Sequence, residues 1–225
     1  MQLIRMLMNI AFFIILKICD LIIAILKLFI GEEKDDGEDA LAKVMSQLNG
    51  IYLRNLLVPI SDNMKTEIDG VFIAPSGVFV IEDKLYNGTI HGNEEKKDWT
   101  QEYYDGSQKE LYNPIMQNRG HVQAIYEQIK DLPVTNPLYT IYSLITFSNR
   151  TTIDIVGTYD DYTICKHKKV KKMIENHHKN IVSAGRELLS EDDIAIIAKQ
   201  LKQWQNYTEE DMLIHIEKVN ERKRA

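Results

Sequence analysis

Three charged residues near the middle of the chain have the types and spacing of a site for metal binding and phosphate chemistry. Asp69 precedes an apolar stretch, and Glu82 and Lys84 end a second apolar stretch, with Glu82 thirteen residues after Asp69. Two carboxylates, completed by water, are typical ligands of Mg²⁺. A divalent cation lowers the pKa of bound water, and a neighbouring ammonium stabilises charge that develops on phosphate. The three residues therefore predict metal-assisted phosphate chemistry if the fold brings them together.

The apolar stretches themselves predict a β-hairpin that would position these residues. Residues 67–73 and 78–84 are rich in Val, Ile and Phe, and the Pro-Ser-Gly sequence at 75–77 is typical of a tight turn. Because side chains two apart on a strand share a face, Glu82 and Lys84 are expected to project together.

The register of this hairpin decides how close Asp69 comes to the other two residues. A turn centred between residues 76 and 77 pairs Asp69 with Lys84, which brings two carboxylates and an ammonium to one end of the hairpin. Asp83 then projects to the other face of the sheet, where it meets solvent or one of the basic helices.

The remaining pattern predicts a mixed α/β or α+β domain. Asn113 followed by Pro114 is typical of a helix start, and the apolar stripe of that helix includes His121. Pro59 is expected to end an early strand, and residues 88–90 to extend the sheet. Further helices are expected over 38–48, 168–178, 191–204 and 209–222, and further strands over 51–58, 138–147 and 162–166.

The composition favours a globular domain in a reducing compartment. Hydrophobic residues make up 44% and charged residues 27% of the 225, which is typical of a folded rather than a disordered chain. Only Cys19 and Cys165 are present, which argues against a disulfide-stapled secreted domain. No Cys/His pattern has zinc-finger spacing. The net charge of −6 disfavours nonspecific binding of polyanions, so a contact with nucleic acid depends on local clusters of charge.

One such cluster lies at residues 166–172, which read Lys-His-Lys-Lys-Val-Lys-Lys. A basic run of this kind forms either a solvated helix face or a patch that follows the phosphates of a nucleic acid. The candidate phosphate contacts are Lys168, Lys169, Lys171 and Lys172.

Residues 1–30 predict a helix that associates with a membrane. They are mostly Leu, Ile, Met and Phe, but four charged residues interrupt the run and fall in one sector of a helical wheel. A spanning helix needs about 20 apolar residues, whereas a helix in the membrane interface keeps a polar stripe in water. Spanning, interfacial and self-associating arrangements therefore stay open, and residues 31–37 form a charged linker.

Short motifs on either side of the central residues occur in a characteristic order. They are Gly37-Glu38 at the first helix, Ile68-Asp69, Gly77-Val-Phe-Val-Ile-Glu82-Asp-Lys84, Gly88-x-Ile90-x-Gly92, Trp99, and Asn113-Pro114-x-x-Gln117. On these motifs, residues 33–130 resemble the nuclease-related domain (NERD) family of the PD-(D/E)xK nuclease superfamily. Each motif alone is weak, whereas six in this order are a strong signal. Asp83 departs from the family, in which this position is usually small or apolar.

The resemblance implies a fold, a cofactor and a role for each matching residue. The fold is a restriction-endonuclease-like central sheet flanked by helices. Asp69 and Glu82 would bind Mg²⁺ or Mn²⁺, and Lys84 would be the catalytic lysine. Glu38 would help to hold the metal or its water, and Gln117 would reach back to the site from its helix.

The function expected from these observations is a membrane-associated, metal-dependent nuclease, with DNA as substrate and the catalytic domain facing the cytoplasm. Residues 38–150 would form the catalytic domain, and residues 151–225 would pack on it or complete it. One alternative is a catalytically inactive module that binds nucleic acid or a protein partner at the membrane. Another is a membrane scaffold that forms homo-oligomers through residues 1–30.

Overall fold

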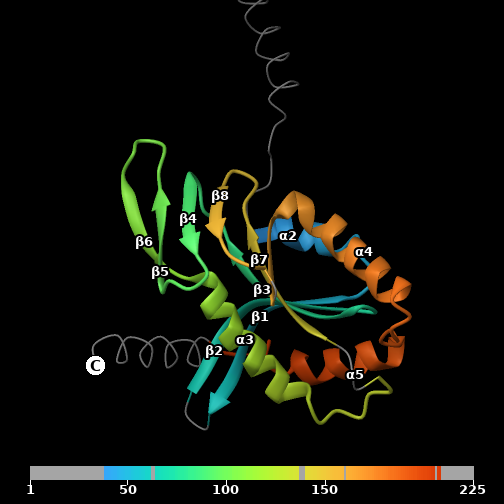
Figure 1. Cartoon of the computed structure of the whole chain (residues 1–225). Helices are drawn as coiled ribbons and strands as arrows, with labels where there is room; N and C mark the ends of the chain where they lie inside the picture. The colour runs from blue at the N-terminus through green and yellow to red at the C-terminus, as the bar shows by residue number, and fades with distance from the viewer. Residues whose placement is uncertain (1–37, 62–63, 137–139, 160, 206, 209–225) are drawn as a thin grey trace, which may run out of the picture. The chain divides into compact units, whose positions relative to one another are not determined.

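The computed structural model describes residues 38–208, apart from residues 62–63, 137–139, 160 and 206. They form two mixed β-sheets with helices packed against them, which confirms the expected mixed α/β class (Figure 1). Within these residues no helix is long and apolar enough to cross a membrane. The expected helices at 1–30 and 209–222 and the linker at 31–37 lie outside the described residues.

The larger sheet has five strands in the order β1-β2-β3-β7-β9. The first three strands are antiparallel, whereas β3, β7 and β9 run parallel to one another. The strands are β1 (Ile51–Ser61), β2 (Met64–Ala74), β3 (Gly77–Lys84), β7 (Ile141–Phe147) and β9 (Tyr162–Lys166). The first six residues of β3 are all buried, because this strand is central and both of its faces are covered.

Two helices cover each face of the larger sheet (Figure 1). They are α2 (Glu38–Met45) and α4 (His167–Ser183) on one face, and α3 (Pro114–Ile129) and α5 (Glu191–Lys202) on the other. Along β3, Val78 and Val80 pack towards α3 and α5, whereas Phe79 and Ile81 pack towards α2 and α4. Because side chains alternate along a strand, Glu82 and Lys84 are directed to the side of α3, and Asp83 to the side of α4.

A second sheet lies beside the first, with the strand order β6-β5-β4-β8. Its strands are β4 (Thr89–Asn93), β5 (Asp98–Glu102), β6 (Gln108–Tyr112) and β8 (Thr152–Val156). The expectation that residues 88–90 extend the larger sheet is wrong, because β4 pairs with β5 and β8 instead. The buried side chains of Ile90, Trp99 and Leu111 pack this sheet against the start of α3, the end of β7 and the start of β9.

The first strand continues past Pro59, so the expectation that this proline ends it is also wrong. Pro59 pairs with Lys65, and the register shifts only between Pro59 and Ser61. A proline is tolerated here because β1 is the outer strand of its sheet and the missing N–H breaks no inner ladder.

The Asn113 side chain caps the start of α3 and also binds the turn between β4 and β5, and the helix begins where the Asn113-Pro114 sequence predicts. The Asn113 side-chain oxygen accepts hydrogen bonds from the backbone N–H groups of Ile115 and Met116. Its amide group donates to backbone carbonyls in the turn between β4 and β5. Asn118, one turn further, is fully buried and donates to the Val80 carbonyl and the Ser143 hydroxyl, both at 2.9 Å. The helix is therefore tied to both sheets.

We expect Asn118→Ala to lower the free energy of unfolding by about 1–3 kcal/mol, because it leaves buried hydrogen-bonding groups on β3 and β7 without their partner. Urea denaturation measures this change. Gln123→Ala, at an exposed position of the same helix, is the control and should change stability by less than about 0.5 kcal/mol. Equal effects of the two substitutions would contradict the role given to Asn118.

Candidate active site

A buried carboxylate, that of Glu82, lies on the α3 side of β3 with only 1% of its side chain exposed. The Lys84 ammonium contacts one of its oxygens, and the Nδ1 atom of His121 lies 3.2 Å from the other. Apart from these two contacts, no described residue donates to the Glu82 oxygens. Because a carboxylate can accept about four hydrogen bonds, Glu82 keeps unused capacity for a further electropositive partner.

Asp69 reaches the same region from β2, but in a different register from the expected one. The hairpin pairs Ala74 with Gly77 and Gly70 with Ile81, and continuing this register beyond the last pair brings Asp69 nearest to Glu82 rather than Lys84. The expected pairing is wrong by two residues because the turn is shorter than its sequence indicates. The two carboxylates still lie near one another, because the charge of Glu82 contributes to the raised pKa of Asp69.

Asp69 also marks the point where the strands depart from regular pairing. Its Oδ2 accepts a hydrogen bond of 2.7 Å from the backbone N–H of Asp83. On the other neighbouring strand, Asn55 has a φ of 52°, a left-handed conformation that asparagine tolerates better than most residues. The Asp69 side chain thus takes the place of a backbone group as acceptor.

The pKa of Asp69 is raised from 3.8 to about 6, mainly by burial and next by the negative charge of Glu82. The Asp83 N–H and the Lys84 ammonium act in the opposite direction but do not cancel the rise. Two carboxylates that repel one another in a buried position are an arrangement that a divalent cation relieves.

Lys84 is a cation held between the strand and α3. Its ammonium contacts Glu82 and donates a hydrogen bond of 3.4 Å to Oε1 of Gln117. Burial is the largest single influence and would lower the pKa of Lys84. The contact with Glu82 and the negative charges of Glu82, Tyr86 and Asp69 together outweigh burial, so the pKa is raised. In this state Lys84 offers a positive charge and a hydrogen-bond donor rather than a general base.

His121 joins the site although the sequence pattern assigned it to an apolar stripe. It lies one turn after Gln117, so both side chains project from the same side of α3. Its side chain is 6% exposed and lies against Glu82. The four-residue spacing from Gln117 is the signal that could have identified it.

Glu38 is the first residue of α2, but its side chain is not among those that the structure describes, so its role stays a prediction. Asp83 faces α4, away from Glu82 and Lys84, and it meets the buried ring of His167. Asp83 therefore meets the basic helix α4 and not solvent, which is one of the two surroundings expected from the sequence.

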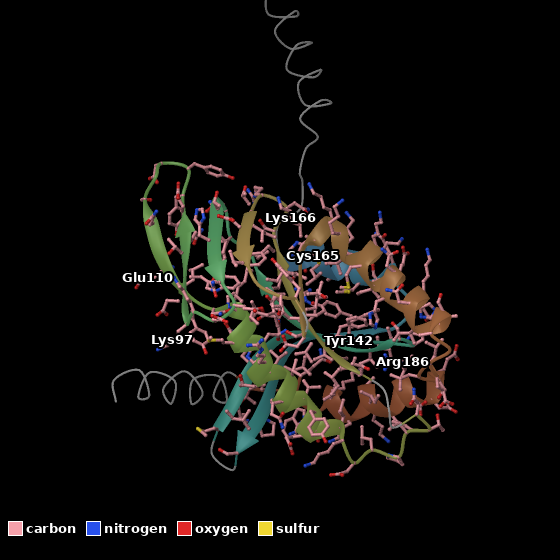
Figure 2. All side chains as sticks on the ribbon, viewed as in Figure 1. Lys97, Glu110, Tyr142, Cys165, Lys166 and Arg186 are labelled. Atoms are coloured by element: carbon pink, nitrogen blue, oxygen red, sulfur yellow. The ribbon has the colours of Figure 1, made fainter. Side chains whose placement is uncertain are left out.

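The four lysines expected to contact phosphate point in different directions from the first turns of α4. Lys169 and Lys172 line a groove of about 400 Å³ beside β9. Lys171 donates to Oε1 of Gln47 at 3.4 Å, and Lys168 is exposed. Figure 2 shows the end of β9, where this helix begins, with Cys165 and Lys166 labelled.

Asp69 and Glu82 are the residues of the site that could hold a divalent cation. Across the described part of the chain, no group of three or more His, Cys, Asp and Glu side chains has a metal-binding arrangement. This donor set fits Mg²⁺, which commonly binds one or two carboxylates and keeps several waters, better than a cation that requires an all-protein cage.

The comparison with family models decides the family. Residues 33–148, slightly more than half of the chain, match the nuclease-related domain. The chain belongs to the nuclease-related domain family. This confirms the resemblance expected from the ordered motifs.

A nuclease-related domain thus accounts for the region that contains Asp69, Glu82, Lys84 and Gln117. An uncharacterized protein of Bacillus anthracis is 36% identical over 92 residues, which cover 40% of this chain and 43% of that protein. The chain therefore spans less than half the length of this relative. No solved structure matches the chain.

In this nuclease-related domain, Asp69→Asn is expected to increase stability at pH 7 when metal is absent. The pKa of Asp69 is higher in the folded state than in the unfolded chain, so the stability of the wild type falls as pH rises from about 4 to about 6. Asparagine does not ionise and can still accept from the Asp83 N–H. The gain should be about 1–3 kcal/mol at pH 7 and should vanish below about pH 4.

Urea denaturation in EDTA at pH 4 to 7 measures this difference. Asp131→Asn, at an exposed loop position, is the control and should change stability by less than about 0.5 kcal/mol. A variant Asp69→Asn that is less stable than the wild type at pH 7 would show that the Asp69 carboxylate is not destabilised by its surroundings.

Proposed function

We propose that this protein is a metal-dependent nuclease that hydrolyses phosphodiester bonds, with DNA as its substrate. Membership of the nuclease-related domain family supports the class of reaction. The observation that carries the proposal is the Glu82 carboxylate, which is buried and short of hydrogen-bond donors, with the Lys84 ammonium against it. Burying a charged acceptor with few donors costs folding free energy. A catalytic role or a bound ion explains why a protein keeps such a group.

The residues of the site divide the work between them. Asp69 and Glu82 would hold Mg²⁺ or Mn²⁺, which when bound lowers the pKa of a water and neutralises charge on phosphate. Lys84 places a positive charge where negative charge develops on the phosphate in the transition state. Gln117 accepts a hydrogen bond from the Lys84 ammonium, and His121 contacts the Glu82 carboxylate.

A polyanionic substrate is supported by the groove beside α4. Lys169 and Lys172 line it together with Asn176, Asn180 and Thr163, and none of its lining residues is acidic. The helix begins at His167, which contacts Asp83, so its first basic turn lies at the same end of β3 as Glu82 but on the opposite face of the sheet. Such a local cluster can bind phosphates in spite of the net charge of −6.

Attachment to a membrane through residues 1–30, with the catalytic domain in the cytoplasm, is part of the proposal. The apolar composition of these residues and the polar sector of their helical wheel support it. Self-association through the same segment is proposed as the route to a homo-oligomer.

Nicking of supercoiled plasmid by the full-length chain tests the proposed reaction. We expect cleavage that requires Mg²⁺ or Mn²⁺, and a loss of at least about 100-fold in Glu82→Gln and in Lys84→Met, because each removes a charge that acts at the phosphate. Gln123→Ala, on the exposed side of α3, is the matched control and should cleave like the wild type.

Equal cleavage by the wild type and both site variants would mean that the activity belongs to a contaminant or to another site. DNA binding without cleavage, unchanged in Glu82→Gln, would instead identify a catalytically inactive binding module.

The proposed phosphate contacts predict a change in the salt dependence of DNA binding. Lys169→Gln with Lys172→Gln should reduce the slope of log affinity against log salt concentration by about 2, because about one counterion is released for each neutralised phosphate. Lys199→Gln with Lys202→Gln is the matched control, since these lysines have the same spacing and are exposed on α5. Fluorescence anisotropy measures both slopes. Equal slopes for the two double variants would exclude the groove as the nucleic-acid contact.

A further inference from the structure

Asp83, which departs from the family pattern, connects the two faces of the larger sheet. On the side of the site, its backbone N–H donates a hydrogen bond of 2.7 Å to Oδ2 of Asp69. On the opposite side, its carboxylate accepts a hydrogen bond of 2.6 Å from the Thr146 hydroxyl. The Nε2 atom of His167 lies 2.6 Å from the same carboxylate oxygen and is therefore the donor.

The partners of the Asp83 carboxylate come from two further elements. Thr146 lies on β7 and pairs directly with Asp83 in the parallel ladder. His167 is the first residue of α4. The His167 side chain is 1% exposed and that of Asp83 is 12% exposed, so both contacts are shielded from water. Hydrogen bonds of this kind are short, strong and geometrically restrictive in a low-dielectric environment.

Asp83 is held at both its backbone and its side chain near the end of β3. The ladder with β7 holds the backbone, and Thr146 and His167 hold the carboxylate, so that together they restrain the N–H that donates to Asp69. A metal ligand must be held to within about 0.5 Å, and groups that orient a ligand affect metal affinity by about 10–100-fold.

We propose that Asp83, fixed by His167 and Thr146, is a positioning residue that sets the Asp69 carboxylate for divalent cation binding from the opposite face of the sheet. The proposal rests on the proposed function, because it assigns to Asp69 and Glu82 the binding of the cation. It also links α4 to the site indirectly, through the contact between His167 and Asp83. The helix that carries Lys169 and Lys172 is anchored, through its first residue, to the strand that positions the metal ligand.

A purely structural contact would have different consequences. If His167 only docks α4 against the sheet, its loss lowers stability and leaves the Asp69 carboxylate in place. Val170 offers the matched comparison, because it is fully buried on the same helix, packs against the same face of the sheet and has no side-chain group that could donate a hydrogen bond to Asp83. A positioning role changes cation affinity at His167 and not at Val170.

The test is a titration of the full-length chain with Mn²⁺, followed by electron paramagnetic resonance of the free ion. We expect His167→Leu to weaken Mn²⁺ binding by about 10–100-fold. His167→Gln should restore most of the affinity, because its amide nitrogen can donate from nearly the position of Nε2. Val170→Ala should lose stability and keep the wild-type affinity. Thr146→Val, which removes one donor without changing volume, should shift affinity in the same direction as His167→Leu.

A second readout does not depend on the cation. In metal-free protein, the amide proton of Asp83 should lose protection from hydrogen exchange in His167→Leu and regain it in His167→Gln. Unchanged Mn²⁺ affinity in both His167→Leu and Thr146→Val would overturn the positioning role. If Mn²⁺ binds Glu82→Gln as tightly as the wild type, the proposed function fails, because the cation then lies elsewhere. The role of Asp83 in cation binding then fails as well. Unchanged hydrogen exchange at the Asp83 amide in His167→Leu would show separately that His167 does not restrain the Asp83 backbone.

Discussion

Burial of the Glu82 carboxylate is the constraint around which the middle of this molecule is arranged. A charge removed from water costs several kcal/mol unless its neighbours compensate for it. The strand supplies Lys84, and α3 supplies His121 together with Gln117, which binds the Lys84 ammonium. These helix residues reach the carboxylate only because α3 lies flat against β3 and β7, where Asn118 is hydrogen-bonded to both strands. Packing and charge compensation are therefore parts of one arrangement.

The central position of β3 gives consecutive residues opposite tasks. Glu82 and Lys84 face α3, whereas Asp83 faces α4, because alternate side chains of a strand project to opposite faces. In a strand with one solvated face, Asp83 would contact water and exert no control over its neighbours. Since both faces are covered here, its carboxylate has protein partners, and the same residue can orient its backbone N–H towards Asp69.

Much of the site could be predicted from local sequence, and what was missed depends on contacts distant in sequence. The shared face of Glu82 and Lys84 and the helix start at Asn113 follow from spacing and capping, which are local rules. The register of the hairpin was wrong by two residues, because Pro-Ser-Gly allows turns of different length. The second sheet was missed, because its short strands are half exposed and read as polar turns. His121 resembled a core residue until the packing of α3 showed its neighbour.

The charges of the site also bear on the class of substrate that suits it. Asp69 and Glu82, when ionised, exceed the single positive charge of Lys84 by one, and burial together with Glu82 opposes the ionisation of Asp69. A bound divalent cation, as proposed, would reverse this excess and leave one positive charge. That residual charge matches the single negative charge of a phosphodiester better than the roughly double charge of a phosphate monoester near neutral pH. The same balance explains why one lysine suffices beside two carboxylates. A second buried cation would compete with the metal for the oxygens of Glu82, and the described residues around that carboxylate include no other lysine or arginine in contact with it.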